Sequence, residues 1–122
     1  MSTDLRHRLG RLGEDLAAQH LVRRGLEIVA RNHRTRFGEI DVIALDGPAL
    51  VFCEVKTRRA GPGSPWDALS DTKRRQVRQM ARAYLVDTPG RPRALEYRFD
   101  AIGIVIDGRG RLVRLDHLED AF

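Results

Sequence analysis

The apolar positions at the start of the chain follow a helical spacing. Leucines recur at intervals of three and four residues, at Leu5, Leu9, Leu12 and Leu16. This interval places side chains on one face of a helix. We therefore expect a helix over residues 5–24. Gly25 is well placed to end it, because glycine readily adopts the left-handed backbone of a helix C-terminus.

Shorter apolar runs separated by turn residues predict strands. Five such runs are expected: Leu26–Ala30, Gly38–Leu45, Leu50–Thr57, Leu95–Asp107 and Arg111–Leu115. A polar, basic segment, Arg31–Arg36, follows the first run. A second helix, starting at about Pro65 or Asp71 and ending at Val86, carries an apolar face and an arginine-rich face. The order α-β-β-β-α-β-β predicts a mixed α/β sheet with a helix on one or both faces.

The two central strands carry apolar residues on both faces, which is typical of strands in the middle of a covered sheet. Strict alternation assigns one face to Ile43, Leu45, Leu50 and Phe52. It assigns the other to Ile40, Val42, Ala44, Val51, Cys53 and Val55. Asp41, Glu54 and Lys56 interrupt these apolar runs, and buried charges need partners, a metal or solvent.

A register for these strands follows from the turn between them. We expect Leu45 to pair with Leu50 across a four-residue loop, because Pro48 disfavours the tightest two-residue hairpin. Asp41 then falls opposite Glu54, and Glu39 falls opposite Lys56. Directly opposed residues have Cβ atoms about 5 Å apart.

Two carboxylates this close repel unless one is protonated or a cation lies between them. Mg²⁺ binds carboxylate oxygens and keeps several waters, and a metal-bound water beside Lys56 would suit phosphodiester hydrolysis. The alternative is a salt-bridged hairpin in which Asp41, Glu54, Glu39 and Lys56 neutralise one another. Glu14 borders a face of small and apolar residues on the first helix, so it is either a third carboxylate of the site or an ordinary surface residue paired with an arginine.

The charge balance favours a polyanionic partner. The 122 residues include 22 basic and 17 acidic ones, for a net charge of +5. Four arginines flank the candidate site: Arg34, Arg36, Arg58 and Arg59. Together with Lys73 on the second helix they could bind phosphates without reading sequence. The alternative is a solvated rim that only keeps the protein soluble.

Several classes of protein are excluded or disfavoured. The chain length predicts a single domain over residues 1–122. No apolar run approaches the roughly 20 residues of a membrane span, and the first residues lack a signal peptide's apolar core. The single cysteine, Cys53, excludes an internal disulfide. We therefore expect a cytoplasmic protein with no membrane partner.

The residues of the candidate site resemble a known family. The relevant segments are Gly38-Glu39-Ile40-Asp41 and Phe52-Cys53-Glu54-Val55-Lys56-Thr57-Arg58, with Gly13-Glu14, Arg31-Asn32, Lys73 and Arg98-Phe99-Asp100 at fitting distances. In this order they resemble the YraN family of bacterial proteins, over roughly residues 10–106. That family is similar to archaeal Holliday junction resolvases, within the PD-(D/E)xK nuclease superfamily. The resemblance implies a restriction-endonuclease-like fold.

The resemblance also implies roles for individual residues. Asp41 and Glu54 would bind Mg²⁺ or Mn²⁺, helped by the Val55 carbonyl and completed by Glu14. Lys56 would position and polarise the attacking water, and Asp100 would support the site. Ile40 departs from the proline of the superfamily motif. Related resolvases act as symmetric dimers, so a homodimer is compatible with the resemblance.

The sequence thus leads to a metal-dependent endonuclease that hydrolyses DNA, on branched or flapped substrates in repair or recombination. The first alternative is a non-catalytic nucleic-acid-binding protein that keeps the nuclease fold. The second is an interaction protein whose basic face meets an acidic partner. The sequence does not distinguish DNA from RNA.

Overall fold

The computed structural model describes residues 3–61 and 70–122. Its elements are α1 (Thr3–Arg23), β1 (Glu27–Thr35), β2 (Gly38–Asp46), β3 (Ala49–Arg59), α2 (Asp71–Asp87), β4 (Glu96–Ile106) and β5 (Leu112–Leu118). This order confirms the predicted succession of helices and strands. None of the described helices is long and apolar enough to cross a membrane.

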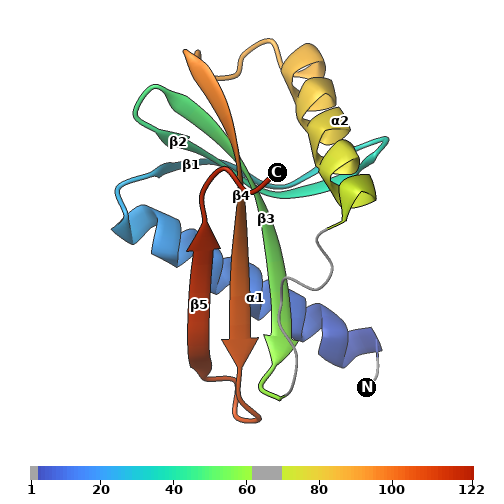
Figure 1. Cartoon of the computed structure of the whole chain (residues 1–122), viewed down its shortest axis with the longest axis vertical. Coiled ribbons are helices and arrows are strands. Elements are labelled where there is room, and N and C mark those ends of the chain that lie inside the picture. Colours follow the sequence, from blue (N-terminus) through green and yellow to red (C-terminus); the bar gives the residue numbers. More distant parts are fainter. Residues whose placement is uncertain (1–2, 62–69) are drawn as a thin grey trace.

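The five strands form one mixed sheet in the order β1-β2-β3-β4-β5. Neighbouring strands are antiparallel except β3 and β4, which are parallel. A parallel pair needs a crossover connection, and α2 lies in the segment that joins these two strands. In Figure 1, α1 passes behind the strands and α2 lies beside the upper part of the sheet.

Each helix covers a different face of the sheet, so both faces are buried. Ala17 and Leu21 of α1 pack on a face that includes Val42, Val51 and Ile104. On the other face, α2 contributes Val77, Met80, Ala81 and Tyr84. This confirms the interpretation of β2 and β3 as central strands apolar on both faces.

The C-terminus of α1 and the N-terminus of α2 lie where the sequence predicts them. Gly25 lies two residues after the end of α1 and has a φ of 89°, a conformation that glycine adopts without a steric penalty. Asp71 is the first residue of α2, and the Ser70 side chain accepts a hydrogen bond from the Lys73 amide at 3.2 Å. The alternative start at Pro65 lies outside the described residues.

The turn between β2 and β3 corrects one prediction. Leu45 pairs with Leu50 as expected, but Asp46 also pairs with Ala49, so the loop has only two residues. The positive φ falls on Gly47, at 55°. The second turn position can then take the negative φ that the ring of Pro48 fixes.

The irregular part of β2 corrects a second prediction. Ile40 packs on the α2 face with Ile43 instead of sharing the α1 face with Val42. The ladder between β2 and β3 extends only to Val42 opposite Cys53, so Asp41 and Glu39 lie beyond it. Strict alternation therefore fails at the point where the candidate site begins.

The lengths of the outer strands also differ from prediction. β1 continues to Thr35, through most of the basic segment that follows the predicted strand. Polar side chains are compatible with this because β1 is an edge strand. β5 runs to Leu118 rather than to Leu115, since its ladder with β4 continues to the Ala101–Leu118 pair.

Candidate metal centre

Three carboxylates from two elements meet at the start of β2. Glu14 lies on α1, and Glu39 and Asp41 lie on β2. One ligand oxygen from each comes within 4.8 Å of the other two. These are the carboxylate oxygens that hard divalent cations prefer. We refer to Glu14, Glu39 and Asp41 as the acidic cluster.

Gly13 explains how α1 approaches the sheet closely enough to bring Glu14 to the cluster. A Cβ atom at this position would collide with the Thr57 side chain of β3. The missing side chain therefore lets the helix backbone pack against β3. The glycine beside the glutamate is thus part of the geometry of the site.

Asn32 holds two of the carboxylates together. Its Nδ2 donates to Glu14 Oε1 at 2.9 Å and to Glu39 Oε1 at 2.8 Å. The residue has a φ of 51°, in the left-handed region that asparagine tolerates better than most side chains. Asn32 was part of the family resemblance but was given no role in the site; that resemblance was the available signal.

Asp41 is the most perturbed member of the cluster. Burial, followed by the nearby Glu54 and Glu14 carboxylates, raises its pKa from 3.8 to about 8. The Val55 amide opposes this shift by donating to Asp41 Oδ2 at 2.7 Å. The Asp41 side chain therefore accepts a backbone hydrogen bond from β3 just beyond the end of the β2–β3 ladder. A cation would favour the ionised form of this carboxyl.

Glu54 lies near Asp41 but is held by a different partner. Its Oε1 is 2.7 Å from Lys73 Nζ, and the pair is mostly buried, with side chains 15% and 29% exposed. Lys73 lies in the first turn of α2. Lys56 follows two residues after Glu54, on the same face of β3, and is exposed. The predicted pairing of Glu39 with Lys56 lies outside the ladder.

The predicted basic residues lie on two segments that separate beyond the β2–β3 ladder, the β1–β2 turn and the end of β3 (Figure 1). Arg34 Nε is 3.6 Å from Glu39 Oε2, with its side chain 89% exposed. Arg36 places its guanidinium 4.9 Å from the centre of the Phe37 ring. Arg58 donates to the Gly61 carbonyl at 2.8 Å. Arg59 is exposed at the end of β3.

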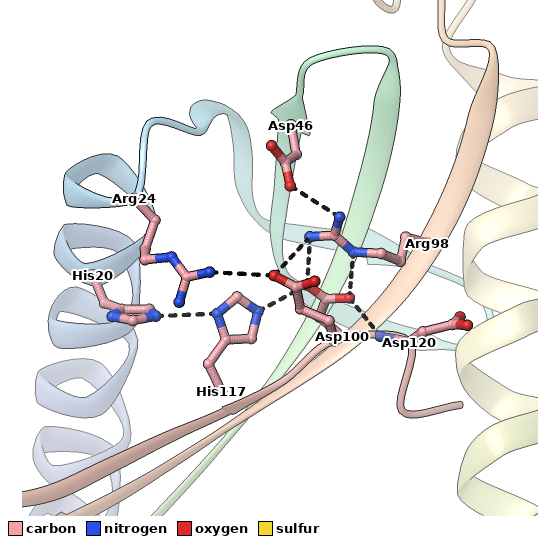
Figure 2. A network of polar contacts seen from close by, with 8 residues as sticks. His20, Arg24, Asp46, Arg98, Asp100, His117 and Asp120 are labelled. Carbon is pink, nitrogen blue, oxygen red and sulfur yellow. Dashed lines mark hydrogen bonds and ion pairs between the residues drawn. The ribbon is translucent and has the colours of Figure 1, made fainter.

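Asp100 belongs to a separate buried network, shown in Figure 2. The residue is fully buried, and its carboxylate accepts from Arg98, from the Asp120 amide and from His117. Burial opposes its ionisation, but the hydrogen bonds from His117 and Arg98 lower its pKa to about 2. Asp100 pairs with Cys53 across β3 and β4. It is therefore one strand from the candidate site and holds β4 to β5.

The network continues to α1 and to the turn after β2. His117 Nδ1 lies 3.1 Å from His20 Nε2, which joins β5 to α1. Arg98 also reaches Asp46 at 2.9 Å. These contacts fix the sheet and α1 relative to one another. They involve none of the three carboxylates of the acidic cluster.

The fold and site define a class: an α/β protein with a five-stranded mixed sheet between two helices and an acidic cluster at one end of the sheet. Comparison with known proteins gives the family. Residues 13–104 match the model of the uncharacterised protein family UPF0102. The chain belongs to this family, which confirms the YraN-family resemblance.

Proteins of this family from several bacteria are similar to this chain over most of its length. A UPF0102 protein of Rhodococcus jostii is 49% identical over 115 residues, covering 93% of this chain and 95% of that protein. One from Pelotomaculum thermopropionicum is 39% identical over 120 residues, covering 98% of both chains. One from Chlorobium chlorochromatii is 42% identical over 119 residues, covering 93% of this chain and 90% of that protein.

Proposed function

We propose that this protein is a divalent-metal-dependent endonuclease that hydrolyses DNA phosphodiester bonds, on branched or flapped DNA, and that its sheet is the core of a restriction-endonuclease-like fold. The observation that carries the proposal is Asp41, a mostly buried carboxyl beside Glu14, Glu39 and Glu54. Structural carboxylates in a sheet are normally paired with a base, as Asp100 is with Arg98. Asp41 instead faces other carboxylates.

The donor set fits Mg²⁺ or Mn²⁺, because every candidate side chain offers oxygen. Asp41 and Glu14 would hold the ion, with Glu54 and the Val55 carbonyl beside them. Glu39 would support the site, since Asn32 ties it to Glu14. When bound, such an ion polarises a phosphoryl oxygen and lowers the pKa of a coordinated water.

The two lysines divide the remaining roles in this proposal. Lys56 is exposed next to Glu54, so its ammonium can position the attacking water and stabilise charge that develops on the phosphate. Lys73 neutralises Glu54 through a 2.7 Å ion pair and so holds this carboxylate in place.

The exposed arginines of the rim would bind the substrate. Arg34 and Arg36 are exposed at the β1–β2 turn close to Glu39, and Arg59 is exposed at the far end of β3. Contacts from such residues to phosphates position a nucleic acid without reading its bases. The rim therefore supports binding that depends on substrate shape and on salt rather than on sequence.

One observation favours a second candidate, a non-catalytic nucleic-acid-binding protein. The Glu54 carboxylate is neutralised by its ion pair with Lys73. A protein that keeps this pair would bind nucleic acid through the rim and would not cleave it. RNA would then be as suitable a partner as DNA.

Cleavage assays with matched variants test both candidates. Labelled single-stranded, duplex, flapped and four-way DNA, and the corresponding RNA, are incubated with Mg²⁺ or Mn²⁺. The proteins are the wild type, Asp41→Asn, Glu54→Gln and a control, Glu27→Gln, at an exposed position of β1. We expect metal-dependent internal cleavage of DNA by the wild type and Glu27→Gln, with a loss of at least about a hundredfold in the two site variants.

The alternatives give different results. Binding that is equal in all four proteins, without cleavage, would overturn the endonuclease and support the binding protein. Cleavage that persists in Asp41→Asn would show that the acidic cluster is not the active site. Cleavage of RNA alone would reject DNA as the substrate.

A further inference from the structure

A second feature lies beside the acidic cluster and has no part in the proposed chemistry. A cavity of about 400 Å³ opens between the β1–β2 turn and α2. Arg36 and Phe37 line it from the turn, and Arg82, Ala83 and Val86 line it from α2. This volume lies in the range of small-molecule sites in proteins.

The lining combines an apolar surface with two positive charges. Phe37, Ala83 and Val86 are apolar, and Val86 is 74% exposed. Within residues 3–61 and 70–122, neither Arg36 nor Arg82 forms an ion pair. Asp87 supplies one negative charge at the same cavity, so an anionic ligand still meets an excess of positive charge.

The cavity and the acidic cluster are close to each other along the chain. The Phe37 carbonyl accepts a hydrogen bond from Gln76 Nε2 of α2 at 2.8 Å, which fixes the turn against the helix. Phe37 is the last residue of the turn before β2, and Glu39 is the second residue of β2. Their Cα atoms are therefore at most about 7 Å apart, so a nucleic acid strand that passes the acidic cluster also passes the mouth of the cavity.

We propose that this cavity binds one unpaired nucleotide of the nucleic acid strand that passes the acidic cluster. The base contacts Val86 and the part of the Phe37 ring that the Arg36 guanidinium does not cover, and the neighbouring phosphate lies between the guanidinium groups of Arg36 and Arg82. A base inside a duplex is stacked and paired, so it cannot enter. The inference rests on the proposed function and adds a substrate preference: a single-stranded segment adjoining the cleaved bond.

The chain offers a matched pair of variants for the test. Val86→Glu places a carboxylate in the cavity, and the exposure of Val86 makes the change compatible with folding. Leu95→Glu makes the same change at a residue that is 91% exposed and lines a different cavity. The Leu95 amide bonds to the Pro48 carbonyl, at the opposite end of β2 from Phe37.

The probes are three DNAs of equal length: a blunt duplex, a duplex with a short single-stranded gap of thymidines, and the same gap built from abasic nucleotides. Fluorescence anisotropy is measured in EDTA, so binding is observed without cleavage. We expect the wild type and Leu95→Glu to bind the thymidine gap about tenfold more tightly than the abasic gap, the usual scale of base stacking on an aromatic group. Val86→Glu should bind both gaps equally.

Arg82→Ala separates the phosphate contact from the base contact. It should weaken binding to both gapped DNAs by a similar factor, because both retain the phosphates. Equal affinity of the wild type for the thymidine and abasic gaps would overturn the proposal, as would a preference that survives in Val86→Glu. Since no metal is present, these results stand whether or not the protein cleaves DNA.

Discussion

At the scale of single residues, Asp41 has a measurable consequence without any ligand. Its pKa is raised from 3.8 to about 8 in the folded protein, first by burial and then by Glu54 and Glu14. The stability that its protonated form contributes is present below pH 3.8 and is lost as the pH rises towards 8. Asparagine does not ionise, so Asp41→Asn removes this pH-dependent loss of stability. Its side-chain oxygen can still accept the hydrogen bond from the Val55 amide.

We therefore predict that Asp41→Asn raises the melting temperature by several degrees at pH 8 in EDTA, and by much less at pH 4. Thermal unfolding of both proteins across this range measures the difference. Glu27→Gln is the control for loss of one exposed carboxylate. A difference between Asp41→Asn and wild type that is constant with pH would show that Asp41 is ionised throughout.

Asn32 combines two effects that separate variants can resolve. Asn32→Gly keeps a backbone that accepts the φ of 51° and removes the amide bonds to Glu14 and Glu39. Asn32→Ala removes the amide and adds the cost of the left-handed conformation. We expect Asn32→Ala to lose about 1 kcal/mol more free energy of unfolding than Asn32→Gly, by urea denaturation. Equal losses would contradict a strained backbone at this position.

At the scale of elements, the contact between α1 and β3 depends on a single glycine. Gly13→Ala should reduce the free energy of unfolding by about 1–3 kcal/mol, because the new Cβ collides with Thr57. Gly10→Ala, on the same helix with open space around it, should increase it by about 0.5–1 kcal/mol through helix propensity. Chemical denaturation of both variants measures the contrast. Equal effects would mean that α1 does not pack closely here.

The contact between α1 and β5 makes stability depend on pH. Burial, followed by His117, Arg24 and Arg23, lowers the pKa of His20 below 6.5. The unfolded chain therefore binds the proton more tightly, and this contribution to stability is lost as the pH falls below 6.5. Asp100, Arg98 and Glu119 also belong to this region. His20→Gln should make the melting temperature depend less on pH between pH 7 and 5.

The control for this prediction is His7→Gln, which changes an exposed histidine of the same helix. Its melting temperature should follow that of the wild type across the pH range. A wild-type slope that remains in His20→Gln would assign the pH dependence to another group. Differential scanning fluorimetry in a series of buffers is sufficient.

At the scale of the whole molecule, the positive charge should govern association. The net charge is +5, and Arg34 is exposed beside the acidic cluster. Arg34→Gln should weaken DNA binding on all sequences and reduce the slope of log affinity against log salt by about 1. Arg93→Gln, exposed before β4, is the control and should leave the slope unchanged. Equal slopes in both variants would exclude Arg34 as a phosphate contact.

Much of the fold could be predicted from the chain because its signals are local. Helical spacing predicted α1, one of the two expected starts of α2, Asp71, is the observed one, and the pairing of Leu45 with Leu50 followed from the turn. Strict alternation predicted the wrong face of the sheet for Ile40. The regular ladder ends beside this residue, where the Asp41 side chain accepts a hydrogen bond from the Val55 amide. Period-two reasoning cannot detect such an interruption.

The candidate site was less predictable because its geometry depends on contacts between distant segments. Asp41 and Glu54 were singled out by their places in apolar strands, and Glu14 needed the family resemblance. The Asn32 bridge joins carboxylates on α1 and β2, and the Lys73–Glu54 ion pair joins α2 to β3. Neither contact follows from spacing within one element.

The central claim is that the acidic cluster binds a divalent cation through Asp41. Calorimetric titration of Mn²⁺ into the protein at pH 7.5 tests it most directly, in two buffers with different ionisation enthalpies. We predict saturable binding at one site with release of a proton, lost in Asp41→Asn and retained in Glu27→Gln. Identical binding by the wild type and Asp41→Asn, or no binding by either, would contradict the account.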